Sequence, residues 1–108
     1  MTSEEVEEIV RNEGEGSLSI VSHGVTLAQA LVRPKQIVLI DRIVRDGSVT
    51  DKELSVWLVG RERSDGGYMI VMREEDFEFG LATQGFRTAK HPILTGWYGS
   101  LISTFEGM

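Results

Sequence analysis

The stretch that decides the fold runs from Leu54 to Thr83 and reads LSVWLVGRERSDGGYMIVMREEDFEFGLAT. It predicts three antiparallel strands joined by two short turns, at 63–67 and 74–76. The first turn holds Ser, Asp and two glycines, which tolerate turn conformations, and the second holds three acids that are too polar to bury. The last strand alternates with a period of two, and one of its faces carries Phe77, Phe79, Leu81 and Thr83.

Upstream of this stretch, residues 37–44 (IVLIDRIV) form the most β-branched segment of the chain and predict a further strand. This segment begins apolar on both faces, and so does the strand that starts at Leu54. Two neighbouring strands of this kind require a cover on the second face of the sheet. The helices predicted near the two ends of the chain are the available covers.

Helix signals stand near both ends of the chain. Thr2 and Glu5 have the spacing of a capping box and predict a helix over about 3–12. Thr26 and Gln29 repeat that spacing and predict one or two helical turns before Pro34. A final helix is expected over 97–106 because apolar side chains recur there at helical spacing, at Trp97, Leu101 and Phe105.

The expected fold is therefore α+β: an antiparallel meander of four or five strands, packed on one face by the N-terminal and C-terminal helices. The strands are expected over about 18–22, 36–45, 54–62, 67–73 and 77–83. The predicted core consists of Ile37, Leu39, Val56, Trp57, Leu58, Ile70, Phe77, Phe79, Leu81, Leu101 and Phe105.

Composition bounds the class of protein. The 108 residues, 41% of them hydrophobic and 26% charged, are expected to form a single globular domain, 1–108. The chain has no cysteine, which excludes disulfides and thiolate metal sites. It has no apolar run of bilayer length, and its first residues are acidic where a signal peptide would be basic. We expect a cytoplasmic protein that does not bind a membrane.

The net charge of −6 is concentrated at the N-terminus, where residues 1–15 hold six glutamates and one arginine. The rest of the chain is nearly neutral. Nucleic-acid binding requires a clustered basic surface, so we expect no nucleic-acid partner. The simplest interpretation of the acidic segment is a solvent-exposed helix face that aids solubility.

Candidates for chemistry are few. His23 and His91 are the only histidines, each lies in a predicted loop, and no sequence spacing joins them to an orienting acid such as Asp41. The sequence also lacks the motifs of calcium loops, phosphate-binding loops and serine hydrolases. We therefore expect no catalytic residue, no metal and no cofactor.

The remaining candidate is a group of basic and aromatic residues that could form a partner-binding site: Arg87, Lys90, His91, Trp97 and Tyr98. These residue types are frequent at protein interfaces, although Trp97 and Tyr98 could equally cover the second face of the sheet. The preferred hypothesis is a small non-catalytic binding protein (an inhibitor, an immunity-type protein or an assembly partner). It is expected to act through a surface loop in the Gln84–Tyr98 segment, which carries these residues, and through a helix face.

Two other classes of function stay open at the level of sequence. One is a small ligand-binding domain or enzyme, with a pocket between sheet and helices that uses His23, His91, Asp41 or Tyr98. The other is a structural subunit of a homo-oligomer. The expected partner is accordingly another protein or a second copy of this chain.

Overall fold

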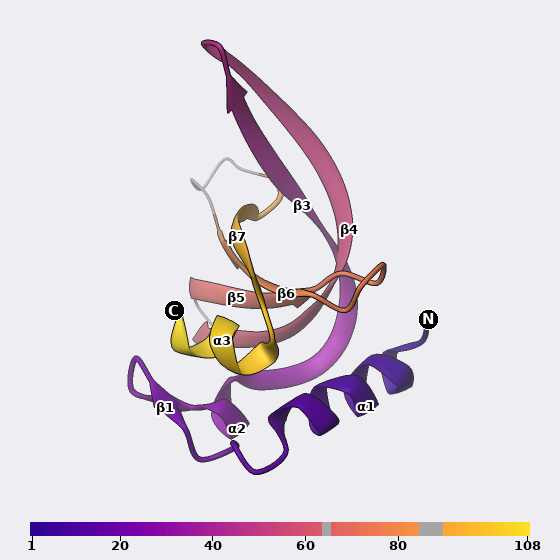
Figure 1. Ribbon diagram of the computed structural model, residues 1–108, viewed down its shortest axis with the longest axis vertical. Helices are drawn as coiled ribbons and strands as arrows, with labels where there is room; N and C mark the ends of the chain where they lie inside the picture. The colour runs from indigo at the N-terminus through magenta and orange to yellow at the C-terminus, as the bar shows by residue number, and fades with distance from the viewer. Residues whose placement is uncertain (64–65, 85–89) are drawn as a thin grey trace.

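The computed structural model describes residues 1–63, 66–84 and 90–108 (Figure 1). Its helices are α1 (Ser3–Gly14), α2 (Leu27–Ala30) and α3 (Leu101–Glu106). Its strands are β1 (Val21–Ser22), β2 (Val25–Thr26), β3 (Leu31–Arg45), β4 (Ser48–Arg63), β5 (Gly66–Met72), β6 (Phe79–Thr83) and β7 (Ile93–Gly99).

Strands β3 to β7 form a closed barrel in chain order, and β1 and β2 form a separate two-stranded sheet. Each successive pair from β3 to β7 is antiparallel, so the first and fifth strands of the series run in the same direction. The barrel therefore closes through a parallel contact, in which Ile40 of β3 faces Ile93 of β7. The Ile40 N–H donates to the Pro92 carbonyl at 2.8 Å.

The barrel divides the buried side chains into two clusters. The inner cluster takes alternate residues of the strands: Leu39, Val56, Leu58, Met69, Val71 and Ala82. The outer cluster joins the residues between them to the helices, and its members from the strands include Trp57, Val59, Ile70, Met72, Phe79 and Leu81. Strands that are apolar on both faces thus bury one face inside the barrel and the other beneath the helices.

Gly80 of β6 allows the barrel to close. A β-carbon at this position would lie 2.6 Å from the Gly96 carbonyl oxygen and 2.6 Å from Cε3 of Trp97. Both contacts belong to β7, so a side chain at Gly80 would push β7 away from β6. The missing side chain leaves room for the Trp97 ring to pack against the inner cluster.

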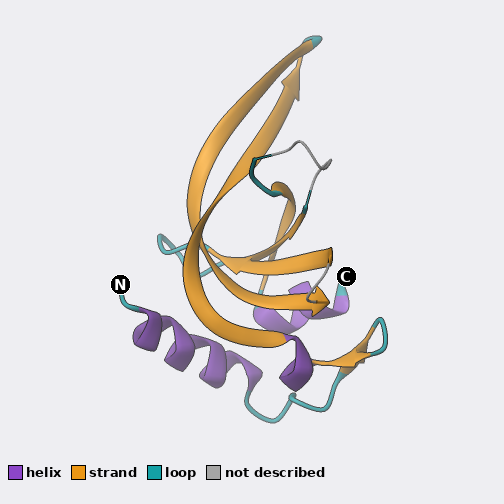
Figure 2. Ribbon diagram, turned by 180° about the vertical axis from the view of Figure 1, so that it is seen from behind, coloured by secondary structure: helices purple, strands orange, loops and turns teal. Residues whose placement is uncertain are grey.

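Helices α1 and α2 begin where the sequence indicates. Both predicted capping boxes are present, from Thr2 and Glu5 at α1 and from Thr26 and Gln29 at α2. Helix α1 inserts buried valines into the outer cluster, and its Glu13 accepts a hydrogen bond from the Leu101 N–H at 3.1 Å. The N-terminal and C-terminal helices are therefore connected directly beneath the barrel (Figure 2).

Strands β3 and β4 are much longer than the others, and their distal ends leave the barrel as a two-stranded ribbon (Figures 1 and 2). We call residues 41–53 the ribbon. At its tip Asp46 and Gly47 have φ values of 49° and 77°, the two positive values of a type I′ hairpin turn. The ribbon gives the molecule its elongated shape, 44 × 30 × 23 Å.

Several predictions of architecture require correction. The α+β class is confirmed, but the sheet is a closed mixed barrel instead of an antiparallel meander covered on one face. The predicted strand 18–22 is reduced to Val21–Ser22, which pairs only with β2. The predicted helix 97–106 starts at Leu101, because 93–99 pair with β6 and Ser100 is the N-cap of α3.

The predicted core is confirmed at most positions, with one clear error. Phe77 is 47% exposed because it lies in the turn between β5 and β6 with a φ of 57°, outside the alternating strand. Strand β6 starts two residues later than expected, at Phe79, which is 1% exposed. Ile37 is half-buried and packs against the inner cluster. Part of the predicted turn at 63–67 falls outside the described residues.

The two phenylalanines provide a matched test of this assignment. Phe79→Ala should lower the free energy of unfolding by about 3–5 kcal/mol, because it leaves a cavity in the outer cluster. Phe77→Ala removes the same atoms from an exposed turn and should cost about 0.5 kcal/mol or less. Urea unfolding of both variants measures the difference. Similar losses of the free energy of unfolding would show that Phe79 is not buried in the outer cluster.

Candidate functional site

A cleft of about 260 Å³ opens at the base of the ribbon, where β5 stops pairing with β4. The last paired residues there are Trp57 and Met72, and the chain then turns through residues 73–78 before β6. The cleft is lined by Gln36, Ser55, Val56, Trp57, Arg73, Glu74 and Glu75. It is therefore formed by β4, by Gln36 of the neighbouring β3 and by the polar turn after β5.

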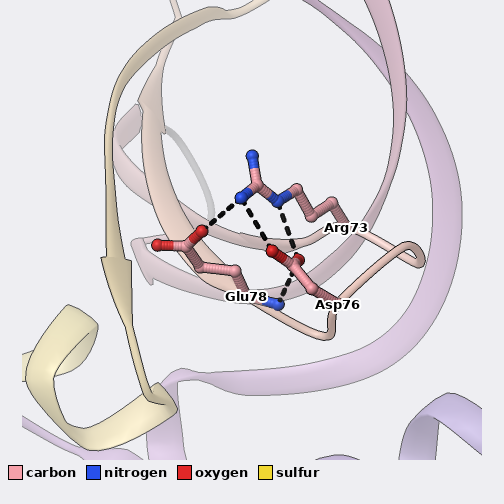
Figure 3. A network of polar contacts seen from close by, with 3 residues as sticks. All are labelled: Arg73, Asp76 and Glu78. Atoms are coloured by element: carbon pink, nitrogen blue, oxygen red, sulfur yellow. Dashed lines mark hydrogen bonds and ion pairs between the residues drawn. The ribbon is translucent and has the colours of Figure 1, made fainter.

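Arg73 organises this turn (Figure 3). Its Nε and Nη2 atoms each donate to a carboxylate oxygen of Asp76 at 2.8 Å, and Nη2 also donates to Glu78. Asp76 in turn accepts the N–H of Glu78 at 3.1 Å. The hydrogen bond from Arg73 lowers the pKa of Asp76, and the same hydrogen bond raises the pKa of Arg73.

Arg73 also lies over the ring of Trp97, with its guanidinium carbon 4.6 Å from the ring centroid. The guanidinium thus connects the turn after β5 to β7 by a cation–π contact. The two paired carboxylates and the Trp97 ring hold the guanidinium in place.

The remaining polar groups of the cleft are acidic. The Trp57 indole N–H donates to Oε1 of Glu74 at 2.7 Å, which fixes that carboxylate, and Glu75 beside it is exposed. Arg73 is the single cation among the described lining residues, and two carboxylates already pair with it. The cleft consequently has an excess of negative charge, which favours a cationic side chain as its occupant.

Of the predicted basic and aromatic residues, the four that the structure describes do not form one exposed patch. Trp97 is half-buried against the inner cluster, whereas Tyr98 is 43% exposed, as expected for adjacent residues on opposite faces of a strand. Lys90 is exposed and His91 is half-buried. Arg87 lies outside the described residues. Among the described residues the cation over the Trp97 ring is Arg73, which was not predicted as a site residue.

His23 forms a small polar group of its own on the β1–β2 turn, where its φ is 51°. Its Nδ1 lies 3.3 Å from Oε1 of Glu62, and Oε2 of Glu62 accepts the Tyr68 N–H at 3.0 Å. Within the described ranges, no hydrogen bond or ion pair connects His23 with His91 or Asp41. No group of three or more potential metal ligands occurs in that part of the chain either.

Sequence reasoning missed the cleft because its acids were interpreted as solvent-exposed turn residues. The available signal is the spacing Arg73, Asp76 and Glu78, which lets one guanidinium reach two carboxylates across a tight turn. The contact of Arg73 with Trp97 has no local signal, since it depends on barrel closure.

No protein-family model, curated protein or solved structure matches this chain. Among the described residues, none of the helices is long and apolar enough to cross a membrane.

The Arg73–Asp76 contact predicts part of the stability of the protein in acid. Because Asp76 has a lowered pKa when folded, its contribution to the free energy of unfolding is complete above the ordinary value of 3.8. The contribution is lost as pH falls through the folded pKa. Urea unfolding below pH 4 should therefore show a shallower loss of stability in Asp76→Asn than in the wild type.

The control is a double-mutant cycle with Arg73→Met. In the Arg73→Met background the further change Asp76→Asn should leave the acid dependence nearly unaltered. An equal effect of Asp76→Asn in both backgrounds would assign the acid sensitivity to another group.

Proposed function

We propose that this protein is a small non-catalytic binding protein, and that its partner is an extended, basic segment of another protein that adds to the free edge of β4. An inhibitor, an immunity-type protein and an assembly partner share one property: each acts by presenting a binding surface to another protein. The single observation that carries the proposal is a free strand edge that ends in an acidic cleft.

The first support is the backbone of β4. Strand β5 pairs with β4 only from Trp57 onward, so the described residues leave 48–56 without a strand on that side. Arg45 and Ser48 close the two-residue turn as a hydrogen-bonded pair, and the alternation of the ladder then directs the N–H and C=O groups of Val49, Asp51 and Glu53 outward. Such a row of groups is the template for strand addition by a peptide.

The second support is charge. Glu53 and Ser55 lie on the same face of β4 as Trp57. This row of side chains ends at the cleft, where Ser55 and Trp57 line the same space as Glu74 and Glu75. Most of the net charge of −6 lies in residues 1–15, so the attraction of a basic partner to this edge would come from the carboxylates of the cleft and not from the charge of the whole chain. A lysine or arginine of the added segment would place its cation among these carboxylates.

The Gln84–Tyr98 segment, of which residues 93–98 belong to β7, stays a separate prediction for a binding surface. Of its predicted contact residues, Lys90 and Tyr98 are exposed, and Arg87 lies outside the described residues. The alternative of a ligand-binding domain or enzyme is supported by one observation, the cleft of about 260 Å³. That volume is below the roughly 300–1,000 Å³ typical of small-molecule sites, so a peptide side chain fits it better.

Selection from a random-peptide phage library tests the proposal, because such a library samples binding sequences of every charge. The selected peptides should be rich in lysine or arginine. When a synthetic peptide of this type is titrated into the labelled protein, the largest NMR amide shifts should occur at residues 49–57 and 73–76.

Charge variants then separate the cleft from general attraction. Glu75→Lys should weaken peptide binding about tenfold or more, because it places a like charge beside the bound cation. Glu8→Lys makes the same change in net charge on the exposed face of α1 and should have a much smaller effect. Equal effects, or amide shifts confined to 84–98, would reject the β4 edge as the binding site.

A further inference from the structure

The ribbon has a second free edge, on β3. Strand β7 pairs with β3 at Ile40 only, so in the described parts of the chain residues 41–45 pair with β4 alone. The Ile40 N–H points away from β4, since it donates to the Pro92 carbonyl. By the same alternation Arg42 and Val44 direct their N–H and C=O groups outward, where no described strand meets them.

The sequence along this edge is chemically self-complementary. Residues 41–45 read Asp-Arg-Ile-Val-Arg, with an acid and a base at equal distances from Ile43. When two such strands run antiparallel about a two-fold axis at Ile43, Asp41 of each copy lies opposite Arg45 of the other. In that register Arg42 lies opposite Val44 of the second copy, and these are the residues whose backbone groups point outward.

We propose that a second copy of this chain pairs with β3 along residues 41–45, antiparallel and centred on Ile43. The pairing extends the two-stranded ribbon of each copy into a four-stranded sheet. It provides backbone hydrogen bonds between Arg42 and Val44 of opposite copies, two Asp41–Arg45 ion pairs and a close Ile43–Ile43 contact.

The groups used are available in the single copy. Val44 is 66% exposed, and neither Asp41 nor Arg45 forms an ion pair with another described residue. Arg42, by contrast, donates to both carboxylate oxygens of Asp51 across the ribbon, at 2.8 and 3.0 Å. That bidentate pair keeps the two strands of the ribbon in register, so the edge is ordered before a second copy arrives.

The neighbouring registers of the β3 edge fail on charge or geometry. Centring the β3 pair on Arg42 places two guanidinium groups opposite each other, and centring it on Val44 requires Asp46, which lies in the hairpin turn. On the β4 edge, centring on Asp51, Lys52 or Glu53 places like charges opposite each other. No β4 register centred on a residue within 50–55 pairs opposite charges, whereas the Ile43-centred register of β3 pairs Asp41 with Arg45 twice. The β3 edge therefore suits a second copy better than the β4 edge does.

The ribbon is narrow, so the interface belongs to the small, weak class of protein–protein contacts. Sedimentation velocity over a concentration series from about 10 μM to about 1 mM should show a reversible monomer–dimer equilibrium. The amides of Arg42 and Val44 should exchange with solvent more slowly at the upper end of this series.

Charge exchange tests the register. Asp41→Arg and Arg45→Asp, each alone, place like charges opposite each other and should raise the dissociation constant about tenfold or more. A mixture of the two variants should dimerise as well as the wild type, because every 41–45 pair then joins Arg to Asp. Recovery in the mixture also shows that both variants are folded.

Glu53→Arg is the matched control, since it makes the same change in charge on the β4 edge and should leave the dimer intact. A monomer at every concentration would overturn the proposal. So would a mixture that stays monomeric, or an equal loss of dimer in Glu53→Arg. None of these results bears on peptide binding to the cleft, which uses the other edge.

Discussion

Three consecutive strands with apolar side chains on both faces impose the constraint on which this structure depends. In β4, β5 and β6 the residues on one face are buried in the inner cluster, and those on the other face are buried with the helices. Neither face can be left to water, because each buries several large side chains. The sheet must therefore curl on itself and also receive α1, α2 and α3 on its outside.

This curvature explains why the ribbon exists. The barrel closes at Ile40, with β7 against the middle of β3, so the distal parts of β3 and β4 have no further strand among the described residues. They continue as a hairpin that the Arg42–Asp51 pair and the Asp46–Gly47 turn hold in register. The free edge of β3 follows from this closing contact, whereas the free edge of β4 and the cleft follow from the end of the β4–β5 pairing at Trp57 and Met72.

Local chemistry made much of the fold predictable, whereas long-range contacts did not. The capping boxes at Thr2 and Thr26 and the alternation of Phe79 and Leu81 depend on neighbouring residues and were predicted correctly. Barrel closure depends on the close approach of Gly80 and Trp97, and no local sequence pattern predicts that two residues so far apart in the chain meet. The same applies to the candidate site, because Arg73 contacts the Trp97 ring only when the barrel is closed. In addition, the helical spacing that begins at Trp97 predicted a helix where Trp97 belongs to strand β7.

Amide hydrogen exchange at Ile40 tests the closed barrel most directly, in dilute protein where self-association is negligible. The closed barrel predicts that the Ile40 amide, bonded to the Pro92 carbonyl at 2.8 Å, is strongly protected, whereas the Arg42 and Val44 amides on the same edge exchange rapidly. An Ile40 amide that exchanged as rapidly as those of Arg42 and Val44 would contradict closure and indicate an open sheet.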